Sequence, residues 1–353
     1  MAKKVVYLFG AGSTQAVLKA ISPEKGLLTP DIQEVIKQYS PRGLDKRIWN
    51  ELITIGDIEH LISVLESQHN YSASEHVKKY YQKAIMELSR NFSTNPPKNN
   101  LYSVLIDLHL NVDGLEEELV SFMTLNYEDI LERTIKVHFK REIDYIITTV
   151  KHKSNGKEPI RVFKLHGSFN WFNSRPIQIR KMTSIASGNT LWIPPGVEKR
   201  KENYPFNLLW GKAFEELMKC DVLRIVGCSL SRNDWGLIPI LYTVQTFNET
   251  DNKIEIEIVD YPETALTIEN TYKYLKVKNI TQFPEFLPFY KKQFNGIDDS
   301  EIIKEVENKF KEKEKTNPLL EWLDAKIDYL VNIPVDITTA QNLVHSFYYK
   351  TNE

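Results

Sequence analysis

Cysteine is scarce in this sequence, and its scarcity excludes two kinds of architecture. The chain of 353 residues has two cysteines, Cys220 and Cys228. A zinc site made of four cysteines and a small scaffold held by several disulfides each need more than two. We therefore expect no structural zinc or other metal, and the low number is typical of proteins in a reducing cytoplasm.

Long hydrophobic runs and an excess of charge of one sign are also absent. The apolar run at residues 5–9 is shorter than the core of a signal peptide, and no stretch approaches the ~20 apolar residues of a membrane span. The formal net charge of −2 provides no basic field for nucleic acid. Local basic runs at 199–201 and 309–315 are interpreted as solvated surface. We expect a cytoplasmic protein that binds neither membranes nor nucleic acid directly.

The order of apolar segments predicts the fold class. Short apolar runs typical of buried strands alternate with stretches of helical periodicity. Such alternation indicates an α/β fold, in which a parallel sheet carries helices on both faces. The predicted strands are residues 5–9, 119–125, 143–150, 160–165, 221–226 and 253–259, and the clearest intervening helices are 16–21, 128–139 and 207–218.

Two segments depart from this alternation. Helical periodicity dominates residues 30–114, with Asp57 as a natural N-cap and a helix at about 74–91. Residues after about 298 also have helical periodicity throughout. We therefore predict an α/β domain made of residues 1–29 and 115–297, a helical insertion at 30–114 and a helical C-terminal extension at 298–353. An apolar stripe in that extension fits either an oligomer interface or packing on the chain's own core; it comprises Trp322, Leu323, Ile327 and Leu330.

Candidate ligand-binding residues follow the predicted strands, because open parallel sheets bind ligands beyond the carboxyl ends of their strands. After the first strand come Gly10, Ala11, Gly12 and Ser13. Glycines let the backbone approach a phosphate, and the helix N-terminus that follows offers free N–H groups. Gln15 occupies the position of the third glycine in a G-x-G-x-x-G fingerprint, so the full dinucleotide motif is absent.

Other strand ends carry polar or small residues. Asn126 and Asp129 stand where a helix begins after the strand at 119–125, and His166 ends the strand at 160–165 beside Gly167. Small residues after a strand can bind phosphate or ribose, and an acid there can bind ribose hydroxyls. Taken alone, each position also has an ordinary explanation as a turn, a helix cap or a core histidine. The remaining candidates are Gly227 and Ser229, after the strand at 221–226, and Asp260, after the strand at 253–259.

Taken together and in this order, the motifs resemble those of the sirtuin family. Residues 10–13 resemble the family's GAG-S phosphate loop, and residues 124–129 (Thr-Leu-Asn-Tyr-Glu-Asp) resemble its T-x-N-x-D segment. The pair His166 and Gly167 resembles the family's HG, which carries the catalytic histidine. Residues 227–230 (Gly-Cys-Ser-Leu) resemble its G-[ST]-S-L loop. The resemblance spans about residues 5–280, apart from the helical insertion, and implies a Rossmann-like NAD-binding domain.

The sequence departs from sirtuin deacetylases in two respects. It lacks their G-I-P-D-F-R stretch and the two cysteine pairs of their zinc module. Tyr127, directly after Asn126, makes the segment look more like that of bacterial sirtuin-like NADases, which deplete NAD in anti-phage defence and often have helices in place of the zinc module. That resemblance implies a homo-oligomer, and a partner such as a hexameric helicase-type ATPase or a phage-sensing protein.

The resemblance also implies the reaction: NAD is the substrate, and cleavage of its nicotinamide–ribose bond gives nicotinamide and ADP-ribose. Asn126 would orient the attacking water, His166 would be the general base and Asp129 would order the site. Two alternatives remain open, namely a sirtuin-type deacylase or ADP-ribosyltransferase, and a non-catalytic NAD or ADP-ribose sensor or scaffold. Asp260 at the ribose would repel a 2′-phosphate, which favours NAD over NADP. The implied pyrophosphate residues are Gly10, Ala11, Gly12 and Ser13, and those for the adenosine side are Gly227, Ser229 and Asp260.

Overall fold

The computed structural model describes residues 2–279, except for 20–25, 95, 97–99, 112–116, 148–155, 181, 183–189, 197–202, 232–233, 235, 248–253 and 261. The predicted C-terminal helices, with their apolar stripe, and the basic runs at 199–201 and 309–315 lie outside the described residues. The division of the chain into an α/β domain, an insertion and an extension stays a prediction.

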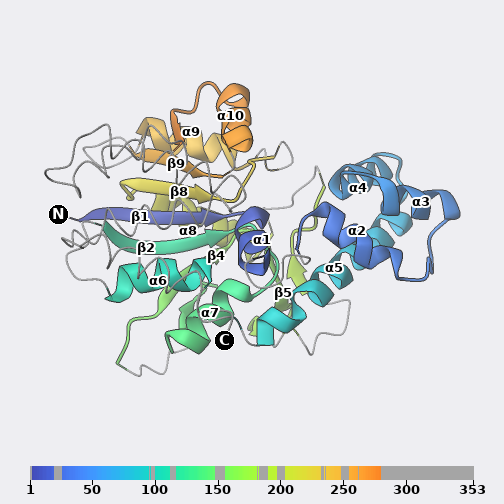
Figure 1. Cartoon of the computed structure of the whole chain (residues 1–353), viewed down its shortest axis with the longest axis horizontal. Coiled ribbons are helices and arrows are strands. Elements are labelled where there is room, and N and C mark those ends of the chain that lie inside the picture. Colours follow the sequence, from blue (N-terminus) through green and yellow to red (C-terminus); the bar gives the residue numbers. More distant parts are fainter. Residues whose placement is uncertain are drawn as a thin grey trace, which may run out of the picture.

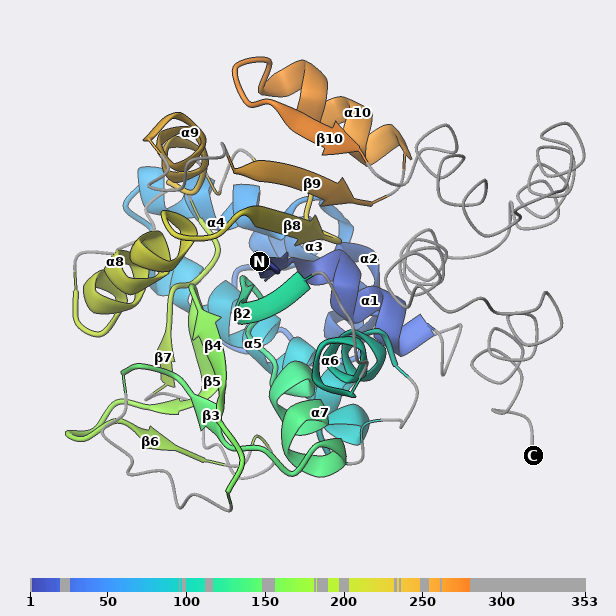
Figure 2. The same cartoon turned by 90° about the vertical axis from the view of Figure 1, so that its left-hand side faces the viewer.

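A seven-stranded parallel sheet forms the centre of the molecule and confirms the predicted α/β fold class (Figure 1). Figure 2 shows helices on both of its faces, with α1, α6 and α7 on one side and α8 and α9 on the other. The strand order is β10-β9-β8-β1-β2-β4-β3. Its strands are β1 (Lys3–Phe9), β2 (Glu117–Thr124), β3 (Ile143–Asp144), β4 (Ile160–Lys164), β8 (Val222–Val226), β9 (Glu255–Val259) and β10 (Val277–Asn279).

The helices that cover this sheet connect its strands. Helix α1 begins directly after β1, and α6 contacts α1, α7 and β2. On the opposite face α8 packs against β4 and α9. Their bounds are α1 (Ala11–Lys19), α6 (Leu101–Asn111), α7 (Ile130–His138), α8 (Phe206–Leu217), α9 (Ile238–Phe247) and α10 (Pro262–Thr271).

A buried ionic group ties the central strands together. Arg224 of β8 is 1% exposed and bridges Glu117 of β2, at 2.5 Å, and Glu257 of β9, also at 2.5 Å. It also donates to the hydroxyl of Tyr7 on β1 at 3.2 Å. A buried cation needs such partners, since desolvation would otherwise cost several kcal/mol. Strands β1, β2, β8 and β9 are therefore linked by side chains as well as by the backbone ladder.

The predicted strand at 143–150 is wrong in its length. Strand β3 has two residues, and the Asp144 carboxylate then accepts from the Ile146 backbone N–H at 2.8 Å. Ile146 has a positive φ of 64°. An aspartate that bonds the backbone two residues ahead favours a turn, and this turn ends the strand. Residues 148–150 lie outside the described part.

A small antiparallel sheet, which the sequence pattern did not reveal, follows β4. It consists of β5 (Gly167–Phe172), β6 (Gln178–Ile179) and β7 (Thr190–Trp192), in the order β6-β5-β7. The chain turns at Gly167, whose φ is +75°. An added Cβ there would lie 2.4 Å from the carbonyl oxygen of Leu191. His166 therefore lies at a turn between two strands rather than at the start of an open loop.

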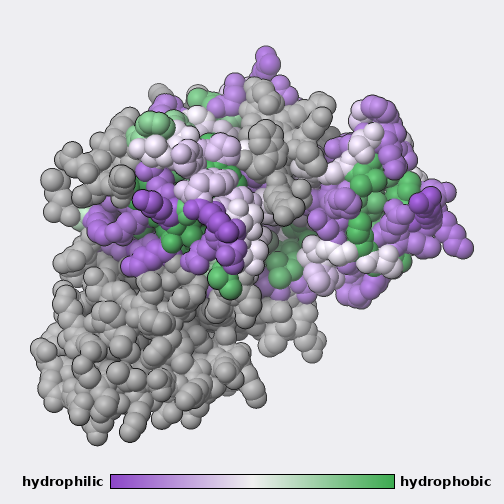
Figure 3. All heavy atoms as spheres, turned by 90° about the horizontal axis from the view of Figure 1, so that it is seen from above, coloured by the Kyte–Doolittle hydropathy of each residue, from purple (hydrophilic) through white to green (hydrophobic). Residues whose placement is uncertain are grey.

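Four helices between α1 and α6 pack on one another as a bundle. They are α2 (Thr29–Lys37), α3 (Lys46–Thr54), α4 (Ile58–Ser67) and α5 (Tyr71–Thr94), with contacts α2–α3, α2–α5, α3–α4 and α4–α5. Figure 1 shows the bundle beyond the carboxyl end of β1, and the face in Figure 3 is mostly hydrophilic there, with a narrower hydrophobic strip. Asp57 caps α4 as predicted, accepting from the His60 N–H at 2.9 Å. No described helix is long and apolar enough to cross a bilayer.

Candidate functional site

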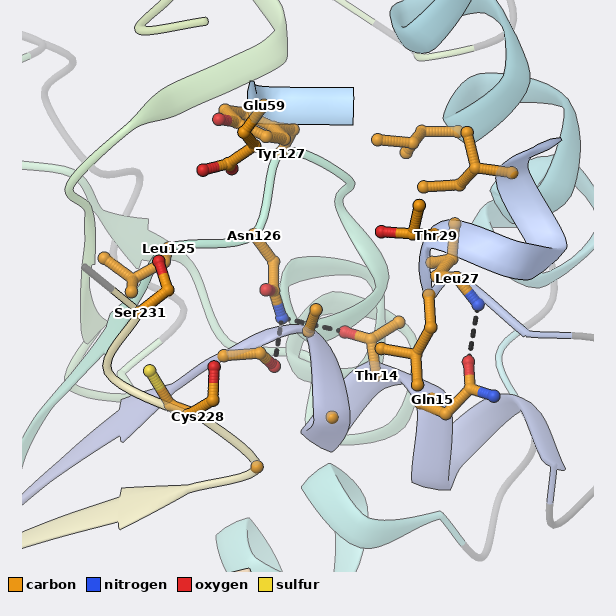
Figure 4. Close-up of a pocket in the computed structure, with 18 of the residues that line it drawn as sticks. Thr14, Gln15, Leu27, Thr29, Glu59, Leu125, Asn126, Tyr127, Cys228 and Ser231 are labelled. Atoms are coloured by element: carbon orange, nitrogen blue, oxygen red, sulfur yellow. Dashed lines mark hydrogen bonds between the residues drawn. The ribbon is translucent and has the colours of Figure 1, made fainter. Parts of the chain in front are cut away.

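A cavity of about 480 Å³ opens at the carboxyl ends of β1, β2 and β8 (Figure 4). From β1 the chain passes to β2 on one side and later returns to β8 on the other, so strand order reverses at β1. Crevices at such switch points are where open parallel sheets bind ligands. The cavity also has a second wall, which is contributed by α2, α4 and α5 of the helical bundle.

Three glycines let the loops after β1 and β8 touch at the floor of this cavity. The Gly10 N–H donates to the carbonyl of Val226 at 3.1 Å, and the Gly12 N–H donates to that of Gly227 at 2.8 Å. Gly227 has a φ of +58°, and a Cβ there would lie 2.1 Å from the Ser13 nitrogen. A Cβ on Gly12 would lie 2.8 Å from the Gly227 oxygen. These glycines are therefore required for contact between the two loops.

Asn126 is held in one orientation by this floor. Its Nδ2 donates to the Gly10 carbonyl at 2.9 Å and to Thr14 Oγ1 at 2.9 Å. A carbonyl oxygen can only accept, so the atom facing Gly10 is the amide nitrogen. Figure 4 shows this nitrogen directed at the loop and the amide oxygen turned the other way. Because Asn126 lines the cavity, Oδ1 offers a fixed acceptor to a ligand.

A buried polar network supports Thr14 behind Asn126. Thr14 Oγ1 donates to Glu128 Oε1 at 2.5 Å and contacts the Tyr102 hydroxyl at 2.8 Å. Burial raises the pKa of Tyr102, so its hydroxyl stays protonated. Since the Thr14 proton goes to Glu128, its oxygen is left to accept from Asn126. The network therefore fixes the direction of the Asn126 amide.

Ser13 and Asp129 lie at the starts of α1 and α7, but their side chains are buried and bonded to other residues. Ser13 is fully buried, and its hydroxyl donates to the Gly10 carbonyl at 2.7 Å. Asp129 is 2% exposed and pairs with Arg133 at 3.1 Å. Neither residue lines the cavity. These partners hold both side chains, and the roles of Ser13 and Asp129 at the site stay predictions.

His166 lines the cavity and has a carboxylate partner. It is 4% exposed, and its Nε2 lies 3.5 Å from Oδ1 of Asp234. Its ring stacks on Tyr127, with centroids 6.1 Å apart and planes 28° from parallel. Tyr127 in turn donates to the Ile193 carbonyl at 3.0 Å. Sequence reasoning missed Asp234, although its place in the loop after β8, close to Ser229, was a usable signal.

The remaining predicted positions also line the cavity, namely Ala11, Gly227, Ser229 and Asp260. The described lining includes no lysine or arginine. A phosphate there would therefore meet backbone N–H groups and the positive end of the α1 dipole. The lining does include five carboxylates, which favour a cationic group nearby; they are Asp57, Glu59, Glu128, Asp234 and Asp260.

The bundle contributes cavity residues that no sequence motif marked. Glu59 comes from the first turn of α4, and Tyr81 and Ile85 come from α5. Tyr81 meets Tyr127 edge to face, with centroids 6.3 Å apart. Burial raises the pKa of both phenols, so both stay neutral. Among the described residues, no group of three or more His, Cys, Asp or Glu side chains could hold a metal ion.

Searches against protein-family models and against curated proteins found no match. Solved structures of Sir2 enzymes are similar in fold at low sequence identity. A structure described as showing the mechanism and regulation of Sir2 enzymes is 15% identical, covers 79% of this chain and 87% of its own, and has a TM-score of 0.37.

Two further structures give similar values. A Sir2 homologue–NAD complex is 17% identical, covers 75% of this chain and 81% of its own, and has a TM-score of 0.35. A mutant Sir2 homologue with ADP-ribose is 15% identical, covers 88% of this chain and 94% of its own, and has a TM-score of 0.35.

The contact between the two loops predicts an unequal response to the same substitution at two glycines. Gly227→Ala should lower the free energy of unfolding by more than about 2 kcal/mol, because the added methyl meets backbone at a positive φ. Gly211→Ala is the matched control. Gly211 lies within α8 with no heavy atom near its missing Cβ, so alanine should stabilise by about 0.5–1 kcal/mol. Urea unfolding measures both, and equal effects would contradict the packing described.

Proposed function

We propose that this chain is an NAD hydrolase, which cleaves the nicotinamide–ribose bond to give nicotinamide and ADP-ribose. One observation carries the proposal. The Asn126 amide is locked with its oxygen toward a cavity that also contains His166 and the Gly10–Gly12 turn. Simple binding of a nucleotide requires neither a fixed amide acceptor nor a histidine paired with a carboxylate.

The proposed position of NAD follows from the charges. The pyrophosphate lies over residues 10–12, at the N-terminus of α1, because the described lining has no cationic side chain to hold it elsewhere. Gly227, Ser229 and Asp260 then face the adenosine half. Asp260 disfavours the additional phosphate of NADP by charge repulsion. The nicotinamide ribose reaches Asn126 and His166, under the wall formed by the bundle.

The proposed chemistry uses these side chains in turn. When the bond between C1′ and the pyridinium nitrogen breaks, its electron pair leaves with neutral nicotinamide, and positive charge develops on the ribose. The cavity carboxylates stabilise that charge. Water, oriented by Asn126 Oδ1, forms the new bond to C1′. His166 accepts its proton, and Asp234 stabilises the resulting imidazolium.

The proposed biological role is depletion of NAD in anti-phage defence. It rests on the resemblance of residues 124–129 to the corresponding segment of bacterial sirtuin-like NADases, together with a helical bundle where deacetylases have a zinc module. On this proposal the chain acts as a homo-oligomer, alone or with a partner ATPase or phage-sensing protein. A deacylase that needs an acylated peptide and a sensor without turnover are the alternatives that the next experiment separates.

The full chain, incubated with NAD and no acetylated peptide, should release nicotinamide and ADP-ribose in equal amounts, as followed by chromatography. Asn126→Ala should reduce the rate by about 100-fold, because the water and the ribose lose their fixed acceptor. Asn50→Ala, on the exposed surface of α3, should retain the wild-type rate. Release that requires acetylated peptide would instead indicate a deacylase, and NAD binding without release would indicate a sensor.

The proposed general base makes a separate prediction. His166→Ala should lower kcat by about 10²-fold or more, whereas KM for NAD should change little. Asp234→Asn should lower kcat by a smaller factor, since it removes the carboxylate charge beside His166 but leaves the base itself. The control is His60→Ala, an exposed position on α4. Wild-type turnover by the His166 variant would overturn the assignment.

A further inference from the structure

A second cavity, of about 400 Å³, lies on the helical bundle and has no part in the site described above. It is formed by one face of α5 and by the loop between α2 and α3. Ligand-binding pockets commonly have volumes of about 300–1,000 Å³, so the space is sufficient for a small molecule. The side chains that line it include Arg42, His76, Lys79, Tyr80, Lys83 and Met86.

Three cations at this cavity lack carboxylate partners. Arg42, Lys79 and Lys83 are exposed, and none forms an ion pair in the part of the chain that the structure describes. Lys78 differs, because it pairs with Glu66 at 2.8 Å and with Glu75 at 2.9 Å. The basic charge at the cavity is thus left uncompensated.

No carboxylate lines this cavity among the described residues. Lys83 Nζ lies 3.8 Å from the centroid of the Tyr39 ring. Glu87, the acid that bonds this tyrosine, accepts from its hydroxyl at 2.7 Å and does not line the cavity. The cavity is therefore basic, whereas the larger cavity at the strand ends, which we propose binds NAD (the NAD cavity), is acidic.

Hydrogen bonds from Tyr80 hold the loop that carries Arg42 against α5 without any ligand. The Tyr80 hydroxyl contacts the carbonyls of Ser40, at 2.7 Å, and Arg42, at 3.0 Å. Gly43 has a φ of +78°, and a Cβ there would lie 2.3 Å from His76 Nε2. The loop and helix are thus in close contact, and the backbone of Arg42 is held beside the two lysines. Such preorganisation lowers the entropy cost of binding.

Two sides of α5 border two different cavities. Lys79 and Lys83 are four residues apart and so lie on one face of the helix, which borders the basic cavity. Tyr81 and Ile85, also four apart, border the NAD cavity. A ligand of the basic cavity would therefore contact the helix that forms a wall of the catalytic cavity.

We propose that the basic cavity is a binding site for a phosphate-bearing small molecule of about nucleotide size. The phosphate meets Arg42, Lys79 and Lys83, and the apolar surface of Tyr80 and Met86 receives the rest of the ligand. Arginine and lysine are the side chains that suit phosphate oxygens. The proposal does not depend on NAD hydrolysis, because it concerns a different cavity and is tested by binding.

The test is calorimetric titration of the full chain with two probes, AMP and inorganic pyrophosphate, at constant ionic strength. Carba-NAD, an uncleavable NAD analogue, is present at saturation so that the cavity at the strand ends is already occupied. Lys79→Gln/Lys83→Gln should weaken the binding of both probes by about tenfold. The control, Lys46→Gln/Lys136→Gln, removes the same two charges at exposed positions that do not line the cavity, and it should bind both probes within about twofold of wild type. Both lysine pairs are on the surface, so folding should be retained.

Three results would overturn the proposal. They are an absence of binding by wild type, equal affinity of wild type and the Lys79/Lys83 variant, and an equal loss in the control variant, which would reflect net charge alone. Failure of NAD hydrolysis is a separate result, because the titration detects binding without turnover. NAD affinity of the Lys79/Lys83 variant, measured in parallel, should equal that of wild type.

Discussion

The contact between the loops after β1 and β8 is the constraint on which the site depends. Their backbones touch because residues 10, 12 and 227 have no Cβ. The contact places the start of α1 against the β8 loop, which closes the floor of the crevice. It also fixes the Gly10 carbonyl, the acceptor that orients the Asn126 amide. The position of the proposed catalytic acceptor thus follows from the packing of two glycine turns.

The two cavities that α5 borders differ in the charge of the side chains that line them. The cavity at the carboxyl ends of the strands has acidic side chains, and the pyrophosphate of the proposed ligand would meet backbone N–H groups there. The basic cavity offers side-chain cations without carboxylate partners. An acidic cavity favours the developing positive charge of nicotinamide loss, and a basic one favours phosphate. One helix therefore borders two sites of opposite electrostatic character.

The sequence was sufficient to predict positions at strand ends, because the carboxyl ends of parallel strands meet at one edge of the sheet. Asn126, His166 and Asp260, far apart in the chain, accordingly line one cavity. The direction of individual side chains was less predictable. Ser13 and Asp129 also follow strands, but Tyr102 and Arg133 hold them inside the protein. Those partners come from elsewhere in the tertiary packing or from the next helical turn.

Where the sequence has no strong local pattern, strands were either not predicted or predicted with the wrong length. The small sheet of β5 to β7 has strands that pair across turns, and the predicted strand at 143–150 ends early at the Asp144 turn. The contribution of Glu59 and Tyr81 to the cavity depends on how the bundle packs against the sheet. The helical periodicity of residues 30–114 does not indicate how these helices pack against the sheet, so the place of Glu59 and Tyr81 in the cavity could not be predicted from the sequence.

On the proposed mechanism, NAD lies with its nicotinamide ribose at Asn126. A crystal structure of the full chain with carba-NAD, in which a carbon replaces the ring oxygen of that ribose and prevents cleavage, tests this most directly. We expect C1′ within about 4 Å of a water held by Asn126 Oδ1, close to the near-attack range, and the pyrophosphate over residues 10–12. A ligand bound in the reverse direction, with adenine at Asn126 and His166, would contradict it.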